Sequence, residues 1–244
     1  MGIEGLNVEA INSKVSRYWS VSVIEETTST QSDLVQQFES GKVLVAEYQS
    51  AGRGRLDRKF IVPPRKGLTF SFCIEATNDF GWIPLLTGLA VAQGINNYLN
   101  SDLVKIKWPN DLLIDEKKLG GILSEKSETG VVVGVGINIF QTQTELPISD
   151  ATSLTNVVRN MEIDRSELLS RILDRIGEVL ADLGKFKNEY REFCSTIGKS
   201  VMVTLPTGQV IEDLAIGIST EGALLLKSHE ITVGDTVHLR NIDK

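Results

Sequence analysis

Three arginines stand close together in the segment QSAGRGRLDRKF, within a chain whose formal net charge at pH 7 is -7. Arg53, Arg55 and Arg58 repel one another unless an anion lies among them. The two glycines of the segment lack a Cβ, so backbone N–H groups can approach a ligand, and each guanidinium presents forked donors that suit phosphate or carboxylate oxygens. The segment therefore indicates binding of a ligand that carries phosphate or carboxylate groups.

Three further stretches at predicted strand ends combine glycine, basic or small polar residues: STQS, KWPNDLLIDEKKLGG and GVGINI. None of the four matches Gly-x-x-x-x-Gly-Lys-Ser/Thr or Gly-x-Gly-x-x-Gly, the patterns of the common nucleotide-binding loops. Each stretch alone is as typical of a turn with solvated side chains. Their occurrence together favours a site for a phosphate-bearing ligand.

Cysteine and histidine are too sparse for other common kinds of site. Cys73 and Cys194 are far apart, which excludes a disulfide framework and a Cys-x-x-Cys metal site. His229 and His238 lie near the C-terminus, away from the arginine segment, which disfavours a histidine zinc site or a Ser-His-Asp triad. The chemistry is expected from Lys, Arg, Asn, Asp and backbone amides.

The composition is that of a globular protein: 244 residues, 41% hydrophobic and 23% charged. A pI near 5.0 disfavours a dedicated nucleic-acid binder, because affinity for the phosphate backbone needs a basic surface. The N-terminus lacks a signal-peptide pattern, and no stretch has the roughly 18 apolar residues of a membrane span. We expect a cytoplasmic protein without a nucleic-acid or membrane partner.

Hydrophobic periodicity predicts a mixed α/β domain, residues 1–193, followed by a small β-barrel, residues 194–244. Ser29 is the expected N-cap of a helix. Strands are predicted at 21–26, 42–49, 68–75, 102–108, 111–115, 119–127 and 130–140, helices at 29–40, 81–99 and 164–193, and short β segments at 200–239.

The motifs TTSTQSDL, AEYQSAGRGRLDRKF, KWPNDLL, KKLGGIL and VGVGINI occur in an order and spacing that resembles the biotin protein ligases. The resemblance covers roughly residues 21–140, and the motifs are specific only as a set. It implies an α+β fold with the mixed sheet of class II aminoacyl-tRNA synthetases and biotin/lipoate ligases, packed with helices, and a small C-terminal Src-homology-3-like β-barrel.

The resemblance also implies a two-step reaction. Biotin, the substrate, attacks the α-phosphate of ATP with its Mg²⁺ to give biotinyl-5'-adenylate and pyrophosphate. A lysine of a biotin carboxyl carrier protein domain, part of a biotin-dependent carboxylase, then attacks the mixed anhydride to form an amide. Positioning and charge neutralisation carry most of such chemistry, which fits a site rich in arginine and lysine.

Individual residues take their roles from the family motifs. Lys118, which bridges the carboxylate and the α-phosphate, and Arg55 are the expected catalytic residues. No dedicated metal site is expected. The expected biotin-binding residues are Ser29, Thr30, Gln31, Gln49, Arg53, Trp108, Lys118, Gly120, Gly121 and Gly136. The expected ATP-binding residues are Gly52, Arg53, Gly54, Arg55, Arg58, Phe60, Asn110, Asp111, Lys118 and Asn138.

Several of these residues have an alternative, structural interpretation. Ser29 can both cap its helix and contact biotin. Asn-Asp after Pro is also an ordinary turn, a lone Trp108 is as typical of a core, and VVVGVG is also typical of a buried strand. Phe60 stands where many relatives have Trp, and Leu56-Asp57 stands where the bacterial pattern often has Arg-Gly. Both departures bear on how tightly the intermediate is held.

The stretch before residue 21 is too short for a winged helix-turn-helix, so the expectation is a ligase without repressor function. Family members of this form are often homodimers, and the Val-rich strand GVVVGVGINIF is a candidate edge or a buried strand. The alternative enzyme is a lipoate/octanoyl ligase of the same fold, which calls for an Arg-Arg-x-Ser-Gly-Gly-Gly type of loop. A third interpretation, a non-enzymatic nucleotide or nucleic-acid binding module, is disfavoured by the acidic charge.

Overall fold

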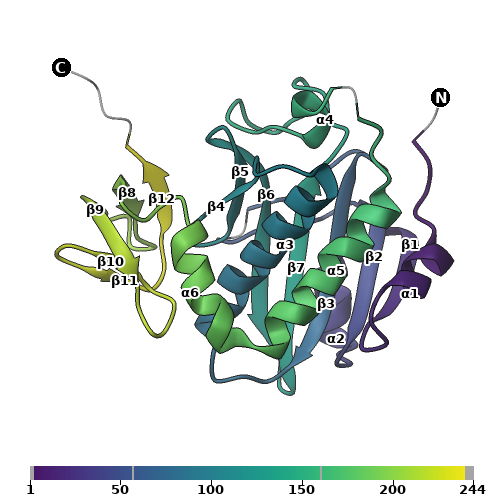
Figure 1. The fold of residues 1–244 in the computed structure, drawn as a ribbon, viewed down its shortest axis with the longest axis horizontal. Coiled ribbons are helices and arrows are strands. Elements are labelled where there is room, and N and C mark those ends of the chain that lie inside the picture. Colours follow the sequence, from purple (N-terminus) through teal and green to yellow (C-terminus); the bar gives the residue numbers. More distant parts are fainter. Residues whose placement is uncertain (1–2, 57, 160, 240–244) are drawn as a thin grey trace.

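A computed structural model describes residues 3–56, 58–159 and 161–239, and a seven-stranded mixed sheet forms its centre (Figure 1). The strand order is β1-β2-β3-β7-β6-β5-β4. β1 runs parallel to β2, and the other neighbours pair antiparallel. The strands are β1 Ser20–Thr27, β2 Lys42–Gln49, β3 Gly67–Glu75, β4 Lys105–Lys107, β5 Asp111–Ile114, β6 Lys117–Lys126 and β7 Gly130–Asn138.

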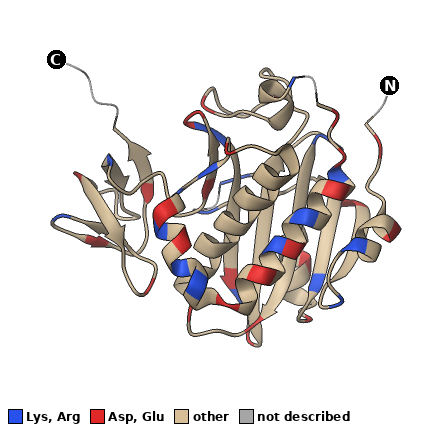
Figure 2. Ribbon diagram, viewed as in Figure 1, with Lys and Arg blue, Asp and Glu red and all other residues tan. Residues whose placement is uncertain are grey.

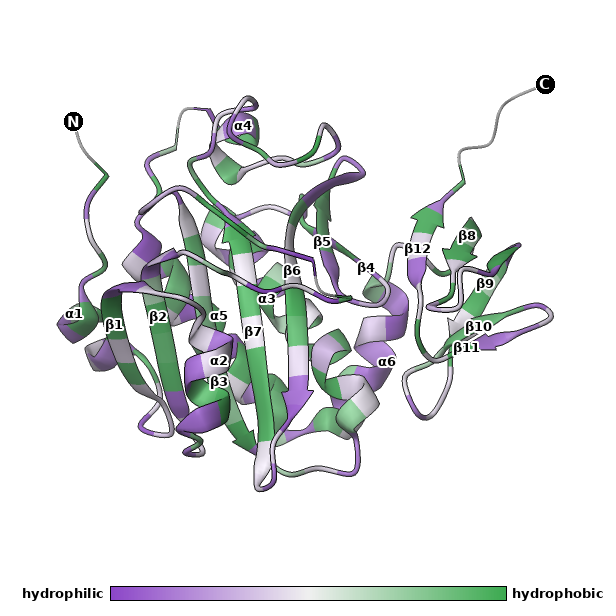
Figure 3. Cartoon of the chain, turned by 180° about the vertical axis from the view of Figure 1, so that it is seen from behind, coloured by the Kyte–Doolittle hydropathy of each residue, from purple (hydrophilic) through white to green (hydrophobic). Residues whose placement is uncertain are grey.

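Helices cover both faces of this sheet. α3 (Ile83–Leu99) and α5 (Arg165–Ala181) pack side by side on one face, and α2 (Thr30–Gln36) lies on the opposite face, where Figure 3 shows it in front of the strands. The apolar side chains of α3, α5 and one side of the sheet form the main core. Figure 2 shows basic and acidic residues interspersed along α5 and α6, as expected for solvated helix faces. The helices are α1 Val8–Lys14, α2 Thr30–Gln36, α3 Ile83–Leu99, α4 Leu154–Val157, α5 Arg165–Ala181 and α6 Leu183–Phe193, with a 3-10 turn at Phe80–Trp82.

A second sheet follows α6 and consists of five antiparallel strands in the order β11-β10-β9-β8-β12. Over the described residues, β11 and β12 are the two edges, so the strands form an open sheet and the expected closure into a barrel is not confirmed. The strands are β8 Ser200–Thr204, β9 Val210–Ile218, β10 Leu224–Leu226, β11 Glu230–Ile231 and β12 Asp235–His238.

Two tryptophans attach this C-terminal sheet to the first domain. The indole N–H of Trp108 donates to the Gly222 carbonyl at 3.1 Å, and that of Trp82 donates to the Thr220 carbonyl at 2.7 Å. Both rings are almost completely buried. Buried indoles need a hydrogen-bond acceptor, and the turn before β10 supplies one to each.

The predicted strands of the first domain are all present, and α2 begins where Ser29 caps it, accepting from the Ser32 N–H at 3.4 Å. The helical pattern predicted at 164–193 is confirmed, but it forms two helices, because α5 ends before Asp182, whose side chain caps α6. α1 has no counterpart among the predicted elements. The interpretation of the Val-rich strand β7 as an edge strand is wrong, and the interpretation as a buried strand is confirmed. β7 pairs with β3 and β6 in the interior of the sheet.

No described helix is long and apolar enough to span a membrane.

Candidate active site

Glycines form a floor on the sheet face that α2 covers. β3 places Thr69 and Ser71 on this face, and they pair with Gly136 and Gly134 of β7, respectively. Gly136 pairs in turn with Gly121 of β6. Because these three adjacent glycines have no side chains, the sheet leaves room for a ligand to lie against its backbone. We call Gly121, Gly134 and Gly136 the glycine floor.

Phe60, at the end of the arginine segment, lies over this floor. A Cβ added to Gly136 would overlap the Phe60 ring, so the ring packs directly on the glycine backbone. The Phe60 N–H donates to the Gly52 carbonyl at 2.9 Å, which closes the segment into a hairpin. Gly52 itself is buried against the Phe60 carbonyl, so this position also requires glycine. A small hollow beside the ring is lined by Glu47, Tyr48, Gln49, Val62, Gly67 and Thr69.

A neutral polar cluster lies at one end of the floor. The Gln49 Oε1, at the end of β2, accepts from the Thr30 backbone N–H at 2.8 Å and lies 3.1 Å from the Thr30 hydroxyl. The Thr30 hydroxyl is 2.8 Å from that of Ser71, which donates to the Gln31 Oε1 at 3.2 Å. Together with the helix cap Ser29, the first turn of α2 thus gathers the predicted residues Ser29, Thr30, Gln31 and Gln49.

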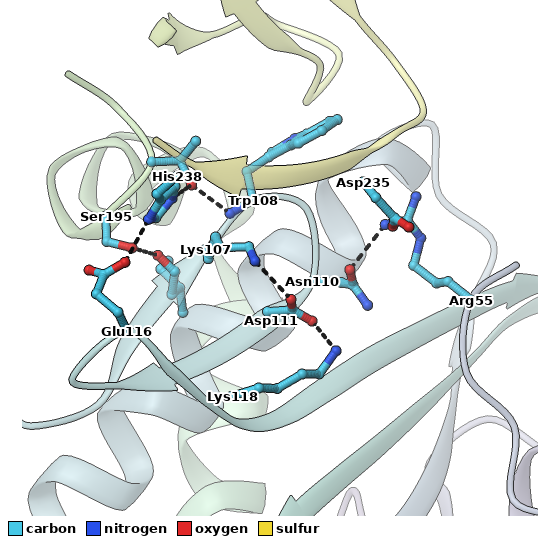
Figure 4. Close-up of polar contacts among 12 residues, drawn as sticks. Arg55, Lys107, Trp108, Asn110, Asp111, Glu116, Lys118, Ser195, Asp235 and His238 are labelled. Atoms are coloured by element: carbon cyan, nitrogen blue, oxygen red, sulfur yellow. Dashed lines mark hydrogen bonds and ion pairs between the residues drawn. The ribbon is translucent and has the colours of Figure 1, made fainter. Parts of the chain in front are cut away.

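A positively charged cluster lies at the other end of the floor. Lys118, at the start of β6, forms an ion pair with Asp111 of β5, whose other oxygen lies 3.4 Å from the Lys107 ammonium (Figure 4). A Cβ built on Gly121 would lie 3.7 Å from the Lys118 Nζ, which places this ammonium over the glycine floor. The Asp111 carboxylate therefore lies between Lys107 and Lys118. An incoming anion would compete with it for both ammonium groups.

Arg55 extends this cluster from the arginine segment. Its guanidinium donates to the Asn110 Oδ1 at 3.0 Å, and the Asn110 amide donates to the Ile122 carbonyl at 2.9 Å. Burial, together with repulsion from Arg58, lowers the pKa of Arg55, and Asp111 partly opposes this shift. Asn110 and Asp111, predicted near the nucleotide, thus hold the two expected catalytic cations.

The other two arginines tie the segment to different elements. Arg53 makes a two-pronged contact with Glu125 of β6 at 2.8 and 3.0 Å. Arg58 pairs with Asp235 of β12, which joins the segment to the C-terminal sheet. Gly54 lies between them, and its N–H donates to the Arg58 carbonyl at 2.7 Å. Leu56 has a φ of 53°, and Asp57 lies outside the described residues.

The hairpin that carries Lys118 is also held by the C-terminal sheet. Glu116, in the turn between β5 and β6, pairs with Lys199 at 2.7 Å and with His238 of β12 at 2.9 Å (Figure 4). Burial lowers the pKa of His238, although Glu116 opposes the shift. Burial alone would raise the pKa of Glu116, but its contacts with Lys199 and His238 lower it.

Three predicted residues lie in positions that favour a structural role. The Trp108 ring points away from Lys118 toward the C-terminal sheet and is only 1% exposed (Figure 4). The Asn138 amide donates to the Thr152 carbonyl at 3.0 Å and accepts from Gln141 at 2.7 Å, so it holds the loop that follows β7. Gly120 is required by the close Gly136 carbonyl of the neighbouring strand.

Lys107 and Ser71 are site residues that the sequence analysis did not single out. Lys107 stands in the KWPND motif itself. Ser71 follows Thr69 by two residues in an otherwise apolar strand, and this polar alternation is a signal that one face of β3 meets something other than the core. Asp235 and Glu125 gave no signal, because their pairing with arginines is created by the fold.

Carboxylates in this region are paired with cations. Among the residues that the structure describes, no group of three or more His, Cys, Asp or Glu gathers where it could hold a metal ion.

Comparisons with known proteins identify the family of this chain. Residues 21–139 match the model of the biotin/lipoate A/B protein ligase family. The chain is 34% identical to a biotin--[acetyl-CoA-carboxylase] ligase of Mycobacterium tuberculosis, over 92% of this chain and 91% of that protein. The chain belongs to the biotin protein ligase family.

A solved biotin protein ligase of Aquifex aeolicus in complex with biotin and ATP superposes with a TM-score of 0.80, at 32% identity, over 91% of this chain and 99% of that one. The bifunctional ligase/repressor BirA of Escherichia coli is 28% identical over 91% of this chain and 74% of its own length. Similarity to ligases thus extends through both sheets.

Proposed function

We propose that this biotin protein ligase activates biotin as biotinyl-5'-adenylate and transfers it to a specific lysine of a biotin carboxyl carrier protein domain. The observation that carries the proposal is the difference in charge between the two ends of the site. A neutral hydrogen-bonding cluster lies at one end of the glycine floor, and Lys118 and Arg55 lie at the other. Biotin has the matching order of groups: a ureido ring, an aliphatic chain and a carboxylate.

In the first step, a carboxylate oxygen of biotin forms a bond to the α-phosphorus of ATP, and the bond from that phosphorus to the bridging oxygen breaks, releasing pyrophosphate. The Lys118 ammonium reduces the repulsion between the two anions and neutralises charge that develops on the phosphoryl oxygens. Asp111 holds this ammonium beside the floor before the substrates bind. Arg55 adds a second cation that Asn110 orients.

In the second step, the neutral amine of the carrier lysine attacks the carbonyl carbon of the mixed anhydride. The bond from this carbon to the AMP oxygen breaks, AMP leaves, and the new amide nitrogen releases a proton. Exclusion of solvent water from the closed site protects the anhydride from hydrolysis. The Phe60 ring lies on Gly136, and once it moves off this position, Phe60 and the arginine segment would cover the intermediate.

The remaining roles and features belong to the same proposal. Ser29, Thr30, Gln31 and Gln49 bind the ureido ring, while Arg53, Arg58 and the segment glycines bind the carboxylate and phosphates. Mg²⁺ arrives bound to ATP, since Asp111 is occupied by Lys118 and Lys107. We further propose a cytoplasmic homodimer without a nucleic-acid partner, with a catalytic domain at residues 1–193 and a C-terminal unit at 194–244 that corresponds to the family's Src-homology-3-like barrel.

Pyrophosphate release from Mg-ATP tests the proposal. The purified protein is assayed with biotin, with lipoate and with neither acid. We expect release that depends on biotin. Release that depends on lipoate alone would instead support the lipoate/octanoyl ligase alternative, and release with neither acid would refute both.

A further inference from the structure

Ser71 occupies the centre of the neutral polar cluster, although it lies on a strand whose neighbouring side chains are mostly apolar. Its side chain is buried, with the residue 1% exposed. Its hydroxyl lies 2.8 Å from that of Thr30 and 3.2 Å from the Gln31 Oε1. Ser71 is therefore the link between the two residues that open α2.

The hydrogen bonds around Ser71 fix the direction of two amides. The Gln31 amide nitrogen donates to the Val132 carbonyl at 3.0 Å, so its oxygen turns toward Ser71. The Gln49 oxygen accepts from the Thr30 backbone N–H at 2.8 Å, which leaves the Gln49 amide N–H groups free of this cluster. Because each hydroxyl has only one hydrogen, the donation from Ser71 to Gln31 directs the Thr30 hydrogen toward Ser71 or Gln49.

Gly134 supplies the space that this arrangement needs. It pairs with Ser71 across β3 and β7. A Cβ at this position would lie 2.7 Å from the Gln31 Oε1 and 3.3 Å from the Ser71 Oγ. The glycine therefore gives room to the Gln31 amide, and any side chain there would move the end of Gln31 away from Ser71.

We propose that Ser71 is a positioning residue that makes this ligase select biotin over an acid with an apolar ring. This inference rests on the proposed function. A buried, pre-oriented set of donors and acceptors pairs with the N–H and C=O groups of a ureido ring. The dithiolane ring of lipoic acid offers no such partners, so its binding would gain none of the hydrogen bonds that a ureido ring gains here. Selectivity thus comes from the direction that Ser71 gives to Thr30, Gln31 and Gln49.

The test is the Ser71→Ala variant, assayed by pyrophosphate release with biotin and with lipoate over a range of concentrations. We expect KM for biotin to rise about tenfold, with kcat at saturating biotin and KM for ATP within about twofold of wild type. The preference for biotin over lipoate, measured as the ratio of kcat/KM values, falls by a similar factor. A merely structural role would not separate KM for biotin from the other constants.

Ser170→Ala is the matched control. Ser170 is 2% exposed, and its hydroxyl donates to the Ser166 carbonyl within α5, on the far side of the sheet. This variant loses a buried hydroxyl without touching the polar cluster, and we expect wild-type KM values and selectivity.

Gly134→Ala provides a second perturbation, since the added methyl would lie 2.7 Å from the Gln31 Oε1 and 3.3 Å from the Ser71 Oγ, and so disturbs the same contact without removing the Ser71 hydroxyl. We expect the same rise in KM for biotin and the same loss of selectivity. If wild type shows biotin-dependent release but both variants keep its KM for biotin and its selectivity, the role of Ser71 is wrong and the proposed function stands. If wild type shows no biotin-dependent release, the proposed function fails and this inference fails with it.

Discussion

The aromatic ring of Phe60 occupies the position that a side chain of residue 136 would take, so Gly136 and Phe60 together define the depth of the site. Gly136 is in the middle of the sheet, and Phe60 ends a hairpin that also carries three arginines. The floor and its cover thus come from segments about 75 residues apart in the chain. A ligand can bind against the floor only if the Phe60 ring moves off Gly136.

A methyl group on Gly136 would compete for that place. We expect Gly136→Ala to raise KM for biotin about tenfold or more, because the added carbon fills the floor and displaces Phe60. Pyrophosphate release measures the effect. Gly88→Ala in α3 is the control, since its added Cβ would meet nothing nearer than 3.8 Å. Equal KM values for biotin in Gly136→Ala and wild type would show that substrate does not lie on this floor.

Replacement of Lys118 separates catalysis from folding. We expect Lys118→Ala to reduce biotin-dependent pyrophosphate release by about a thousandfold, a magnitude seen when a charge-stabilising group is removed. The side chain is partly exposed, so the unfolding temperature should stay within a few degrees of wild type. Lys117→Ala, at the exposed neighbouring position, should keep its activity. Undiminished release by Lys118→Ala would remove this lysine from the mechanism.

The pair formed by Arg58 and Asp235 predicts that the C-terminal sheet helps to hold the arginine segment over the adenylate. Exposed ion pairs contribute at most about 1 kcal/mol, so Asp235→Asn should speed release of the intermediate by no more than about fivefold. Labelling of a bystander protein measures this leakage. The difference should shrink at high salt, which screens exposed charges.

Asp213→Asn controls for the loss of a carboxylate from the same sheet, because Asp213 contacts Ser228 rather than the segment. Leakage from Asp235→Asn that equals wild type at low salt would show that the sheet does not retain the segment.

Glu145 predicts a specific dependence of stability on pH. Its contact with Lys66, followed by hydrogen bonds from Thr142, lowers the pKa of Glu145 from 4.5 to about 2. A carboxyl group whose pKa is lower in the folded than in the unfolded protein stabilises the folded state at pH values above its unfolded pKa. This stabilisation is lost as the pH falls through the folded pKa. The unfolding temperature of wild type should therefore exceed that of Glu145→Gln at pH 7, and the difference should decrease between pH 4.5 and about 2. A difference that stays constant down to pH 3 would contradict this assignment.

The sequence predicted the strands of the first domain well, because buried strands such as β2 and β3 are short, apolar runs bounded by turn residues. The break between α5 and α6 was not predictable from periodicity, since the apolar spacing continues through Asp182 and only its cap reveals the end of a helix. Open or closed pairing of the C-terminal strands depends on contacts between distant residues, which local patterns do not contain.

The site also contains residues that the sequence predicted and residues that it did not. Lys118, Arg55 and Gln49 were selected because they match the motifs of the family that the sequence resembles, and the structure gathers them around the glycine floor. Their roles in binding and catalysis stay predictions. Ser71 was missed because the alternation of Thr69 and Ser71 indicates only that one face of β3 is polar, and what Ser71 contacts depends on its neighbours on β7 and α2. Trp108 illustrates the reverse: an aromatic residue inside a functional motif is used by the core.

Transfer of biotin to protein tests the central claim most directly. A biotin carboxyl carrier protein domain is incubated with the purified ligase and Mg-ATP, with biotin or with lipoate, and its mass is measured by mass spectrometry. The account predicts that the carrier gains one biotinyl amide on a lysine, and gains nothing when biotin, ATP or Lys118 is removed. A carrier that stays unmodified with biotin, or that is modified only with lipoate, would contradict it.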